Sequence, residues 1–491
     1  MSRLLAKKPL SVIMAEAAES GEHSLKRSLG PINLVTLGIG AIIGAGIFVL
    51  TGTAAAQFAG PAIVLSFVIA GVGCVFAGLC YAEFASMIPI SGSAYTYGYA
   101  TLGELVAWII GWALVLEYAF GAATVAVGWS GYVTGLLKFF GLTIPFNPSP
   151  AGEIAGLPFH VDIFAMAAIV VITLILVVGV RESANFNSTA VTIKVSVVLI
   201  FIGLALAFAG GHWSLMTAHW HPFIPKNQGS FGQFGWSGIM RGAGVVFFAY
   251  IGFDAVSTAA QEAKNPQKDM PFGILGSLVI CTILYIVVAL LLTGLVPYTA
   301  LNTPAPVADG AAVIGVQWGV FLIDLGAIAG LASVMLVMLL GMSRVLYTMS
   351  HDGLLWPWVG KIHPKFRTPY LTSIVVGAFV AFLAACFPIV FLAKLVSLGT
   401  LLAFTIVCLG VWVMRVREPG AERPFRTPAV PLVPILGMFV SIALMLSLDM
   451  PAWIGFASWL VFGLLIYFGY SRKHSHVQQA LQKATGAVAR R

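Results

Sequence analysis

The stretch Gly38-Ile-Gly-Ala-Ile-Ile-Gly-Ala-Gly-Ile-Phe48 decides the fold of this 491-residue chain. It lies in the first apolar segment, residues 32–53, which is long enough to span a bilayer as a helix. Glycine recurs through the stretch, and a glycine inside a helix costs about 1 kcal/mol relative to alanine. An interrupted backbone survives in lipid only where protein buries it or where it lines a wet cavity. We therefore expect the helix to break at Gly44-Ala45-Gly46, near the middle of a membrane.

The composition predicts a polytopic α-helical membrane protein. Hydrophobic residues make up 59% of the chain and charged residues 9%, whereas soluble globular proteins carry about 25% charged residues. The long apolar runs exclude a membrane β-barrel, whose segments are short and alternating. All five cysteines fall in apolar segments, so we expect no metal, cofactor or disulfide framework. The chain has no His-Glu-x-x-His or Gly-x-Ser-x-Gly motif, so we expect no enzyme and no catalytic residues.

Twelve apolar segments are predicted to cross the membrane. They cover residues 32–53, 62–87, 103–136, 162–180, 189–210, 235–260, 273–296, 313–347, 371–388, 391–414, 431–448 and 452–470. With the N-terminus in the cytoplasm, most of the 26 lysines and arginines fall in cytoplasmic segments, as the positive-inside rule requires. Both termini are therefore expected in the cytoplasm of a cell whose plasma membrane holds the protein. The net charge of +8 indicates attraction to anionic membrane lipids rather than to nucleic acid.

The sixth segment contains a second glycine-interrupted stretch, Gly242-Ala-Gly-Val-Val-Phe-Phe-Ala-Tyr-Ile-Gly252. It comes five segments after the first, and an odd offset reverses the orientation of a helix in the membrane. Two broken helices at matching places in oppositely oriented halves indicate an inverted-repeat transporter. The alternative is that these glycines only permit close helix packing, as the spacing Gly40-x-x-x-Gly44 would allow.

Both stretches resemble motifs of the amino acid–polyamine–organocation (APC) superfamily. The motifs are Gly44-Ala-Gly-Ile-Phe48 and Phe247-Phe-Ala-Tyr-Ile-Gly-Phe-Asp254, the latter followed by Gln261-Glu-Ala-Lys-Asn-Pro266. Within that superfamily, the chain is most similar to the cationic amino acid transporter family and its bacterial relatives. The resemblance covers all twelve segments. It implies an all-α, five-plus-five inverted repeat of the leucine-transporter type, with helices 1 and 6 broken and two helices added at the C-terminus.

This fold implies a division of the chain into five parts. They are a cytoplasmic N-terminal tail (1–31), a first repeat of helices 1–5 (32–210), a second repeat of helices 6–10 (235–414), helices 11–12 (431–470) and a cytoplasmic C-terminal tail (471–491).

The broken helices are expected to bind a zwitterionic amino acid through their backbone. The outer half of helix 1 begins near Gly44, Ala45, Gly46 and Ile47, whose free N–H groups and positive dipole end suit a carboxylate. The inner half ends near Ile43, whose carbonyl suits an ammonium group. Carbonyls near Phe248, Ala249 and Ile251 in helix 6 add further acceptors, and the resemblance assigns these positions the same roles. It also makes Phe248 the aromatic gate over the substrate; the alternative for Phe248 is packing against lipid.

Lys194 is the expected proton-coupling residue. It lies in the fifth segment, roughly 8 Å from the cytoplasmic end. The resemblance implies that its ammonium replaces a sodium ion between helices 1 and 8, with Gly40 and Ile43 carbonyls and the Ser333 hydroxyl as partners. Burial disfavours the charged form of an amine, which suggests coupling to protons without sodium. Snorkelling of the side chain to the membrane surface is the alternative.

Other intramembrane charges are candidates for coupling or gating. Glu117 lies near the midplane and is expected to be a site-side or proton-linked acid, or else a structural hydrogen-bond partner. Glu83, Asp254 and Glu262, towards the cytoplasmic ends of helices 2 and 6, are expected to form an inner gate or an ion-pair network. Arg241 lies near the outer mouth, where an outer-gate role competes with a structural one.

The expected function is secondary active, proton-coupled uptake of L-amino acids by alternating access. By resemblance, Leu331 caps the side-chain pocket, which favours small or medium neutral substrates. The expected partners are the amino acid substrate, protons and membrane lipids. Two alternatives remain, namely a uniporter or exchanger of cationic amino acids such as arginine and lysine, and a membrane amino acid sensor. A sensor would carry a long cytoplasmic signalling domain, so the short loops of this chain disfavour that alternative.

Overall fold

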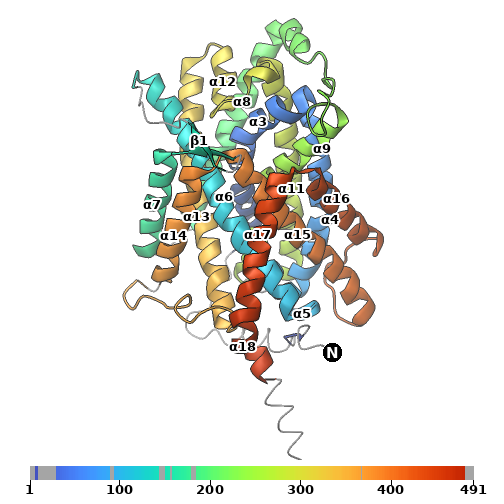
Figure 1. The fold of residues 1–491 in the computed structure, drawn as a ribbon. Coiled ribbons are helices and arrows are strands. Elements are labelled where there is room, and N and C mark those ends of the chain that lie inside the picture. Colours follow the sequence, from blue (N-terminus) through green and yellow to red (C-terminus); the bar gives the residue numbers. More distant parts are fainter. Residues whose placement is uncertain are drawn as a thin grey trace, which may run out of the picture.

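The structure is a computed structural model that describes residues 6–8, 29–88, 93–142, 150–154, 157–178, 184–366 and 368–480. Most of the predicted N-terminal tail and residues 481–491 of the predicted C-terminal tail lie outside these ranges. The described chain is a bundle of helices with one small β-hairpin (Figure 1).

The α-helices are α2 (Pro31–Ile42), α3 (Thr51–Ala54), α4 (Ile63–Met87), α5 (Ser93–Thr101), α6 (Glu104–Phe139), α7 (Ile163–Val178), α8 (Ala184–His219), α9 (Gly235–Val246), α10 (Ala255–Thr258), α11 (Pro266–Leu295), α12 (Pro306–Val313), α13 (Gln317–His351), α14 (Tyr370–Cys386), α15 (Ile389–Arg417), α16 (Leu432–Ser447), α17 (Met450–Ile466) and α18 (Arg472–His474). Turns of π-helix cover Gly46–Leu50, Ala55–Ala59 and Tyr467–Ser471, and turns of 3-10 helix cover Gly60–Ala62, Phe247–Tyr250, Ala260–Glu262 and Tyr298–Ala300. The strands β1 (Pro150–Ile154) and β2 (Leu157–His160) pair antiparallel, with Ile154 opposite Leu157.

The described chain contains 8 helical stretches that are long and apolar enough to cross a membrane, and four shorter apolar helices. These helices coincide with the predicted apolar segments, so the all-helical prediction is confirmed. In the first segment, the short helix α2 is separated from a continuous helical stretch that begins at Gly46 and runs to Met87. The full set of twelve spans and the inverted repeat stay predictions.

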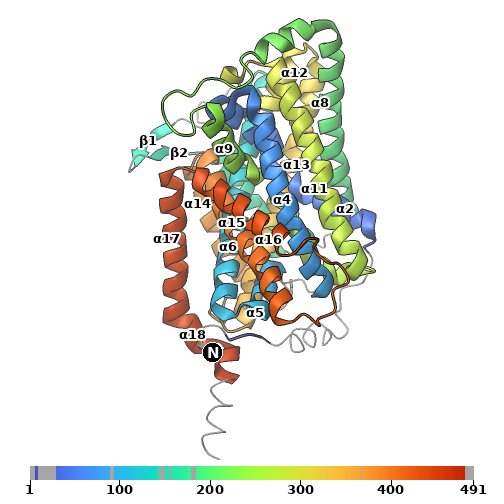
Figure 2. The same cartoon turned by 90° about the vertical axis from the view of Figure 1, so that its right-hand side faces the viewer.

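Helix α6 lies at the centre of the bundle. It packs along α13 on one side and α15 on another, and α4 packs along α11. Because α6 is apolar on all faces, it is suited to such a buried position. Helices α7 and α14 form a pair at the periphery, and α17 stands at the edge of the bundle (Figures 1 and 2).

The described parts of both chain ends meet the same end of the bundle. The Lys8 ammonium pairs with a carboxylate oxygen of Asp352, after α13, at 2.9 Å. The buried carboxylate of Glu104, the first residue of α6, accepts hydrogen bonds from Tyr467 at 3.0 Å and from Ser475. Both ends therefore lie on one side of the bundle.

Candidate functional site

The first helix is interrupted at Ile43 and Gly44. Helix α2 ends at Ile42, and Ile43 has extended backbone angles (φ −71°, ψ 104°). The helix resumes at Ala45 and continues through the π-helical turn Gly46–Leu50. The predicted interruption is therefore present, and it begins one residue before the predicted break. The first N–H groups of a helix have no partner in a preceding turn, so the helix that starts at Ala45 can offer N–H donors to a ligand.

The sixth segment is interrupted after the 3-10 turn Phe247–Tyr250. Ile251 is extended (φ −62°, ψ 135°), and Gly252 has a φ of 117°, which favours glycine. A Cβ atom at Gly252 would also lie 2.7 Å from the carbonyl carbon of Ala41. Glycine at this position therefore serves both the turn and the close approach of α2.

The two interruptions touch each other. A Cβ atom on Gly46 would overlap the backbone of Ala249, so only glycine lets the two segments lie this close. The Tyr285 hydroxyl of α11 lies 2.9 Å from the carbonyl oxygen of Ile42 and 2.8 Å from that of Ala249. One phenol therefore spans the end of α2 and the end of the outer half of the sixth segment.

Tyr285 was not among the residues predicted from the sequence. It is fully buried, and its ring packs against Phe67 and Tyr250, each with a centroid distance of 5.5 Å. Its only sequence signal is a hydroxyl inside the apolar segment 273–296. A tyrosine in that setting usually packs through its ring, so sequence reasoning gave no reason to single it out.

The residues predicted to bind substrate are buried around the two interruptions. They are Ile43, Gly44, Ala45, Gly46, Ile47, Phe248, Ala249, Ile251 and Leu331. Phe248 is only 4% exposed, which argues against the alternative of packing on lipid. Leu331 lies on α13 one turn before Val334, whose methyl carbon is 3.5 Å from a Cβ placed on Gly44. Contacts with a substrate stay predictions for all of these residues.

Lys194 connects three helices. Its ammonium on α8 donates to the carbonyl oxygen of Gly40 on α2 at 2.7 Å. Its methylene chain lies against Gly330 on α13, where a Cβ atom would come 2.8 Å from the Lys194 Cγ. The side chain is 2% exposed and its head group is bonded inside the protein, so it does not snorkel to a surface.

The predicted partners of Lys194 are present only in part. The Gly40 carbonyl is the acceptor, but the Ser333 hydroxyl donates to the Gly330 carbonyl at 2.9 Å within its own helix. That bond uses the hydroxyl proton and leaves the Ser333 oxygen able to accept, but no bond from Lys194 to Ser333 occurs among the described residues. The expected bond from Lys194 to the Ile43 carbonyl does not occur among the described residues.

Glu117 and Asp254 are both buried carboxyl groups. Glu117 Oε2 accepts from the Thr400 hydroxyl at 2.7 Å, and Asp254 Oδ1 accepts from the backbone N–H of Gly252 at 3.3 Å. The other oxygen of each carboxyl group is buried and has no partner in the described part of the chain. Asp254, expected towards the cytoplasmic end of its segment, lies in the turn that follows Gly252.

The remaining predicted gate residues have structural partners. Glu83 forms ion pairs with Arg415 at 2.8 Å and with Arg423 at 3.2 Å, so it belongs to an ion-pair network. Arg241 donates to the carbonyl oxygen of Ser447 at 3.1 Å, which ties α9 to the end of α16.

Glu262 forms a backbone hydrogen bond with the residue that leads into α2. Its carbonyl oxygen accepts from the N–H of Leu29 at 2.9 Å, and the N–H of Lys264 donates to the Leu29 carbonyl at the same distance. These two bonds join the start of α2 to the end of the sixth segment. A gating role for Arg241, Asp254, Glu262 or Phe248 stays a prediction.

The described residues bring no three histidine, cysteine, aspartate or glutamate side chains together as metal ligands. The five cysteines are buried free thiols. The Tyr285 phenol, the Lys194 ammonium and the Asp254 carboxyl group lie at the two interruptions or within one turn of them.

Comparisons with known proteins agree with this architecture. Residues 29–481 match the amino acid permease family. The chain is 44% identical over 476 residues to a methylthioribose transporter of Bacillus subtilis, covering 97% of this chain and 99% of that protein. It is 45% identical over 465 residues to a branched-chain amino acid permease of the same organism, covering 94% and 97%. A vacuolar cationic amino acid transporter of Arabidopsis thaliana is 38% identical over 400 residues, covering 81% and 65%.

These matches confirm the resemblance noted in the two glycine-rich motifs. Together with the helices that are long and apolar enough to cross a membrane, they establish that the chain is a multi-pass membrane protein of the amino acid permease family, within the amino acid–polyamine–organocation superfamily.

Proposed function

We propose that this protein takes up neutral L-amino acids of branched-chain size, together with protons, by alternating access. The observation that carries the proposal is the contact between two helix interruptions, with Gly46 against Ala249. N–H groups at the start of the outer half of helix 1 bind the substrate carboxylate, and nearby carbonyls bind its ammonium. Backbone dipoles then neutralise both charges, which avoids burying an unpaired side-chain charge.

The substrate class is supported by one relative and by the residues beside the site. A relative 45% identical to this chain is named a branched-chain amino acid permease. The side chain that meets Gly44 is Val334, and Leu331 precedes it by one turn in the same buried region. These apolar side chains favour leucine, isoleucine and valine over polar substrates.

Proton coupling is proposed to run through Lys194. Its hydrogen bond to the Gly40 carbonyl lies one turn before the interruption of helix 1. A hydrogen bond from an ammonium is roughly twice as strong as one between neutral groups. Loss of the proton from Lys194 therefore loosens its hold on α2 and frees the inner half of the helix to move.

Glu117 and Asp254 favour a second candidate, the transport of cationic amino acids. Each carboxyl group has one buried oxygen without a partner in the described residues, so a substrate ammonium or guanidinium group would find acceptors there. Similar transporters in plants are named cationic amino acid transporters. For a neutral substrate, one of these two carboxyl groups instead holds a proton that moves during the cycle.

A substrate panel in proteoliposomes tests the proposal. The purified protein is assayed without sodium, under an inward proton gradient, with labelled leucine, isoleucine, valine, arginine, lysine and methylthioribose. Preferential accumulation of the branched-chain substrates supports the proposal, and preferential arginine or lysine uptake supports the second candidate. Substrate binding without uptake of any compound would contradict both and would favour a sensor.

A further inference from the structure

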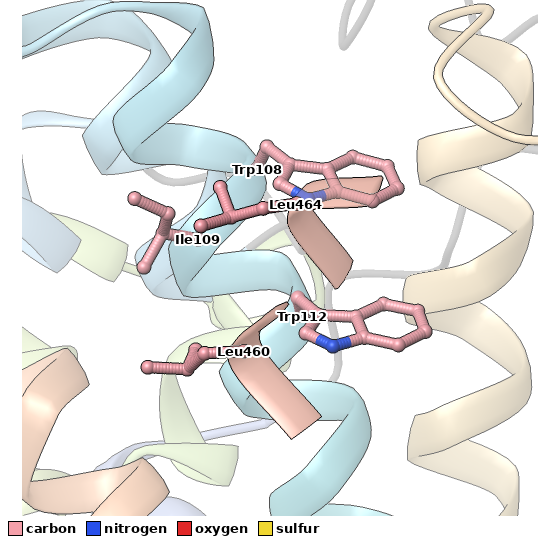
Figure 3. Close-up of a pocket in the computed structure, with 5 residues that line it drawn as sticks. All are labelled: Trp108, Ile109, Trp112, Leu460 and Leu464. Carbon is pink, nitrogen blue, oxygen red and sulfur yellow. The ribbon is translucent and has the colours of Figure 1, made fainter. Parts of the chain in front are cut away.

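Helix α6 meets its neighbours α17 and α13 in different ways. Towards α17 it borders a space of about 50 Å³ that is lined by Trp108, Ile109, Trp112, Leu460 and Leu464 (Figure 3). That contact is apolar, and the indole N–H groups of both α6 tryptophans already donate to carbonyl oxygens of α17. Towards α13, by contrast, α6 meets a carboxyl group that the proposed transport cycle does not use, that of Asp324.

The Asp324 carboxyl group is buried against the backbone of α6. The residue is 2% exposed, and a Cβ atom at Gly135 of α6 would lie 3.7 Å from each of its two carboxyl oxygens. Its Oδ1 atom is enclosed and has no hydrogen-bond partner in the part of the chain that the structure describes. Glycine at position 135 therefore leaves room beside the carboxyl group but offers it no polar side chain.

The other buried acidic residues of the described chain all accept hydrogen bonds. Their carboxyl oxygens accept from hydroxyl, guanidinium or backbone N–H groups, as in Glu83, Glu104, Glu117, Asp162, Asp254 and Asp269. Among the same described residues, no hydrogen bond or ion pair reaches Asp324. An ionised carboxylate buried in this way costs several kcal/mol, so Asp324 is held in its neutral, protonated form.

The titratable groups around the first half of α13 do not neutralise Asp324. Those on the elements that pack against α13 are Tyr132 and Lys138 on α6, Asp162 before α7, Lys194, His212 and His219 on α8, Asp309 on α12 and Cys386 on α14. All but Lys138 and Cys386 have hydrogen-bond partners elsewhere. Lys138 is exposed one turn beyond Gly135, and Cys386 is a buried free thiol. Within the described chain, none of these groups forms an ion pair with Asp324.

Asp324 lies in the half of α13 that is remote from the chain ends. The helix begins at Gln317 and ends just before Asp352, which pairs with Lys8 on the side of the chain ends. Asp324 is about 10 Å along the axis from Gln317, at 1.5 Å per residue. Figure 1 shows α12, which precedes α13, at the end of the bundle opposite α18. Since both chain ends are expected in the cytoplasm, Asp324 is expected in the outer half of the membrane.

Tyr132 links this face of α6 to the outer half of the first helix. It precedes Gly135 by three residues, so it lies on the same face of α6, one turn deeper. Its hydroxyl donates to the Phe48 carbonyl at 2.7 Å, and the two rings meet edge to face at 6.0 Å. Phe48 belongs to the π-helical turn Gly46–Leu50. The face of α6 that meets Asp324 therefore also holds the segment that follows the first interruption.

We propose that Asp324 is a proton-binding site that takes its proton from water on the outer side and supplies it to the transport cycle. This inference rests on the proposed proton coupling. An O–H bond forms on the carboxylate when a proton arrives from outside, and it breaks when the proton passes through water inside the protein to Lys194. The Lys194 side chain lies against Gly330, which is about 9 Å deeper along α13. Asp324 then determines how fast protons enter, and Lys194 determines whether uptake is coupled to them.

Infrared spectroscopy tests whether Asp324 holds a proton. A protonated carboxyl group has a C=O band separate from the bands of carboxylates and amides, and this band shifts in heavy water. The full chain in lipid membranes at neutral pH is compared with Asp324→Asn, and the wild-type-minus-variant spectrum should contain one such band. Asp309→Asn, which makes the same change at an exposed carboxyl group on α12, should give no band of this kind.

The rate of leucine uptake tests the supply of protons. In sodium-free proteoliposomes under an inward proton gradient, Asp324→Asn should take up leucine more slowly but reach the wild-type level of accumulation. A positioned proton-transfer group contributes roughly 10²–10⁴-fold where proton transfer limits the rate, so we expect the initial rate to fall by at least about tenfold. Leucine exchange, which needs no net proton entry, should keep its wild-type rate. Asp309→Asn should match the wild type in both assays.

Three results would overturn the proposal. They are an infrared difference spectrum without the protonated carboxyl band, a wild-type rate of gradient-driven uptake in Asp324→Asn, and a loss of exchange as large as the loss of uptake, which would indicate a structural role. Failure of the proposed function looks different, because the wild-type protein itself would then show no gradient-driven accumulation of leucine. In that case the supply of protons to transport is overturned as well, and the infrared spectrum still decides whether Asp324 binds a proton.

Discussion

A single phenol reaches both helix interruptions. The Tyr285 hydroxyl is within 2.9 Å of the Ile42 carbonyl and 2.8 Å of the Ala249 carbonyl, and the side chain is fully buried. A phenol has one proton to donate, so it fully satisfies only one of these acceptors at a time. Tyr285 therefore keeps the two interruptions in register, and a positioning role in the proposed substrate site is a prediction.

Tyr285→Phe should weaken leucine binding without unfolding the protein. Leaving a buried carbonyl without its donor costs about 1–3 kcal/mol, and a cost of that size on the bound state corresponds to a loss of affinity of roughly fivefold to 150-fold. Isothermal titration with leucine measures this loss. Tyr347→Phe, at a partly exposed position on α13, is the matched control and should bind like the wild type. If both variants bind leucine with equal affinity, the Tyr285 hydroxyl does not position the binding site.

Lys194→Ala should uncouple transport from the proton gradient. The substitution removes the ammonium that holds the Gly40 carbonyl, and it changes no residue of the two interruptions. We expect gradient-driven leucine accumulation to fall to the equilibrium level, while leucine exchange across the membrane persists. Lys138→Ala, at the exposed end of α6, should accumulate leucine normally. Normal accumulation by Lys194→Ala would show that another group carries the proton.

At the residue scale, the sequence predicted that Lys194 is a buried, bonded residue more completely than it predicted its hydrogen-bond partners. A lysine in an apolar segment is rare enough to demand a partner, and the Gly40 carbonyl is that partner. The expected bond from Lys194 to Ser333 does not occur among the described residues, where the Ser333 hydroxyl donates to the Gly330 carbonyl of its own helix. Tyr285 was missed because a tyrosine ring packs in an apolar segment with or without a role for its hydroxyl.

At the scale of elements, the two interrupted helices were predictable, but the roles of individual glycines were not. Low helix propensity does not distinguish Gly44 from Gly46. The structure distinguishes them, because Gly46 touches the Ala249 backbone and Gly44 only makes ordinary contact with Val334. The sequence also could not predict that Asp254 lies in the turn after Gly252, because this depends on where the 3-10 turn Phe247–Tyr250 ends.

Gly46→Ala should therefore destabilise the protein more than Gly44→Ala. A methyl group at position 46 meets backbone that cannot move aside, and overpacking of this kind typically costs about 1–3 kcal/mol. At position 44 the nearest atom is 3.5 Å away, which is ordinary contact. Thermal unfolding of the two variants in the same detergent measures the difference. Equal melting temperatures would contradict the close contact between the interruptions.

At the scale of the whole molecule, Glu104 joins segments that are far apart in the sequence. Its buried carboxylate accepts from Tyr99 at 2.9 Å, from Tyr467 at 3.0 Å and from Gln478 at 3.3 Å, as well as from Ser475. Composition and apolar segments predicted the helical membrane bundle. They could not predict this junction, because no periodic pattern relates the start of α6 to the C-terminal segment.

Glu104→Gln should loosen the C-terminal segment. Hydrogen bonds to a charged group contribute about 1.5–3 kcal/mol, and the amide replaces the shared carboxylate with one acceptor. We expect faster proteolytic cleavage after α17 and a lower melting temperature. Glu418→Gln, at an exposed position, should change neither. Wild-type cleavage rates in Glu104→Gln would show that other contacts hold the segment.

The paired interruptions and Lys194 are proposed to couple amino acid uptake to protons. The most direct test is the internal pH of sodium-free proteoliposomes, read by a trapped pH-sensitive dye while leucine is added outside. We predict that leucine entry acidifies the lumen in wild-type proteoliposomes and that Lys194→Ala abolishes this acidification. Leucine entry into wild-type proteoliposomes without any fall in internal pH would contradict the account.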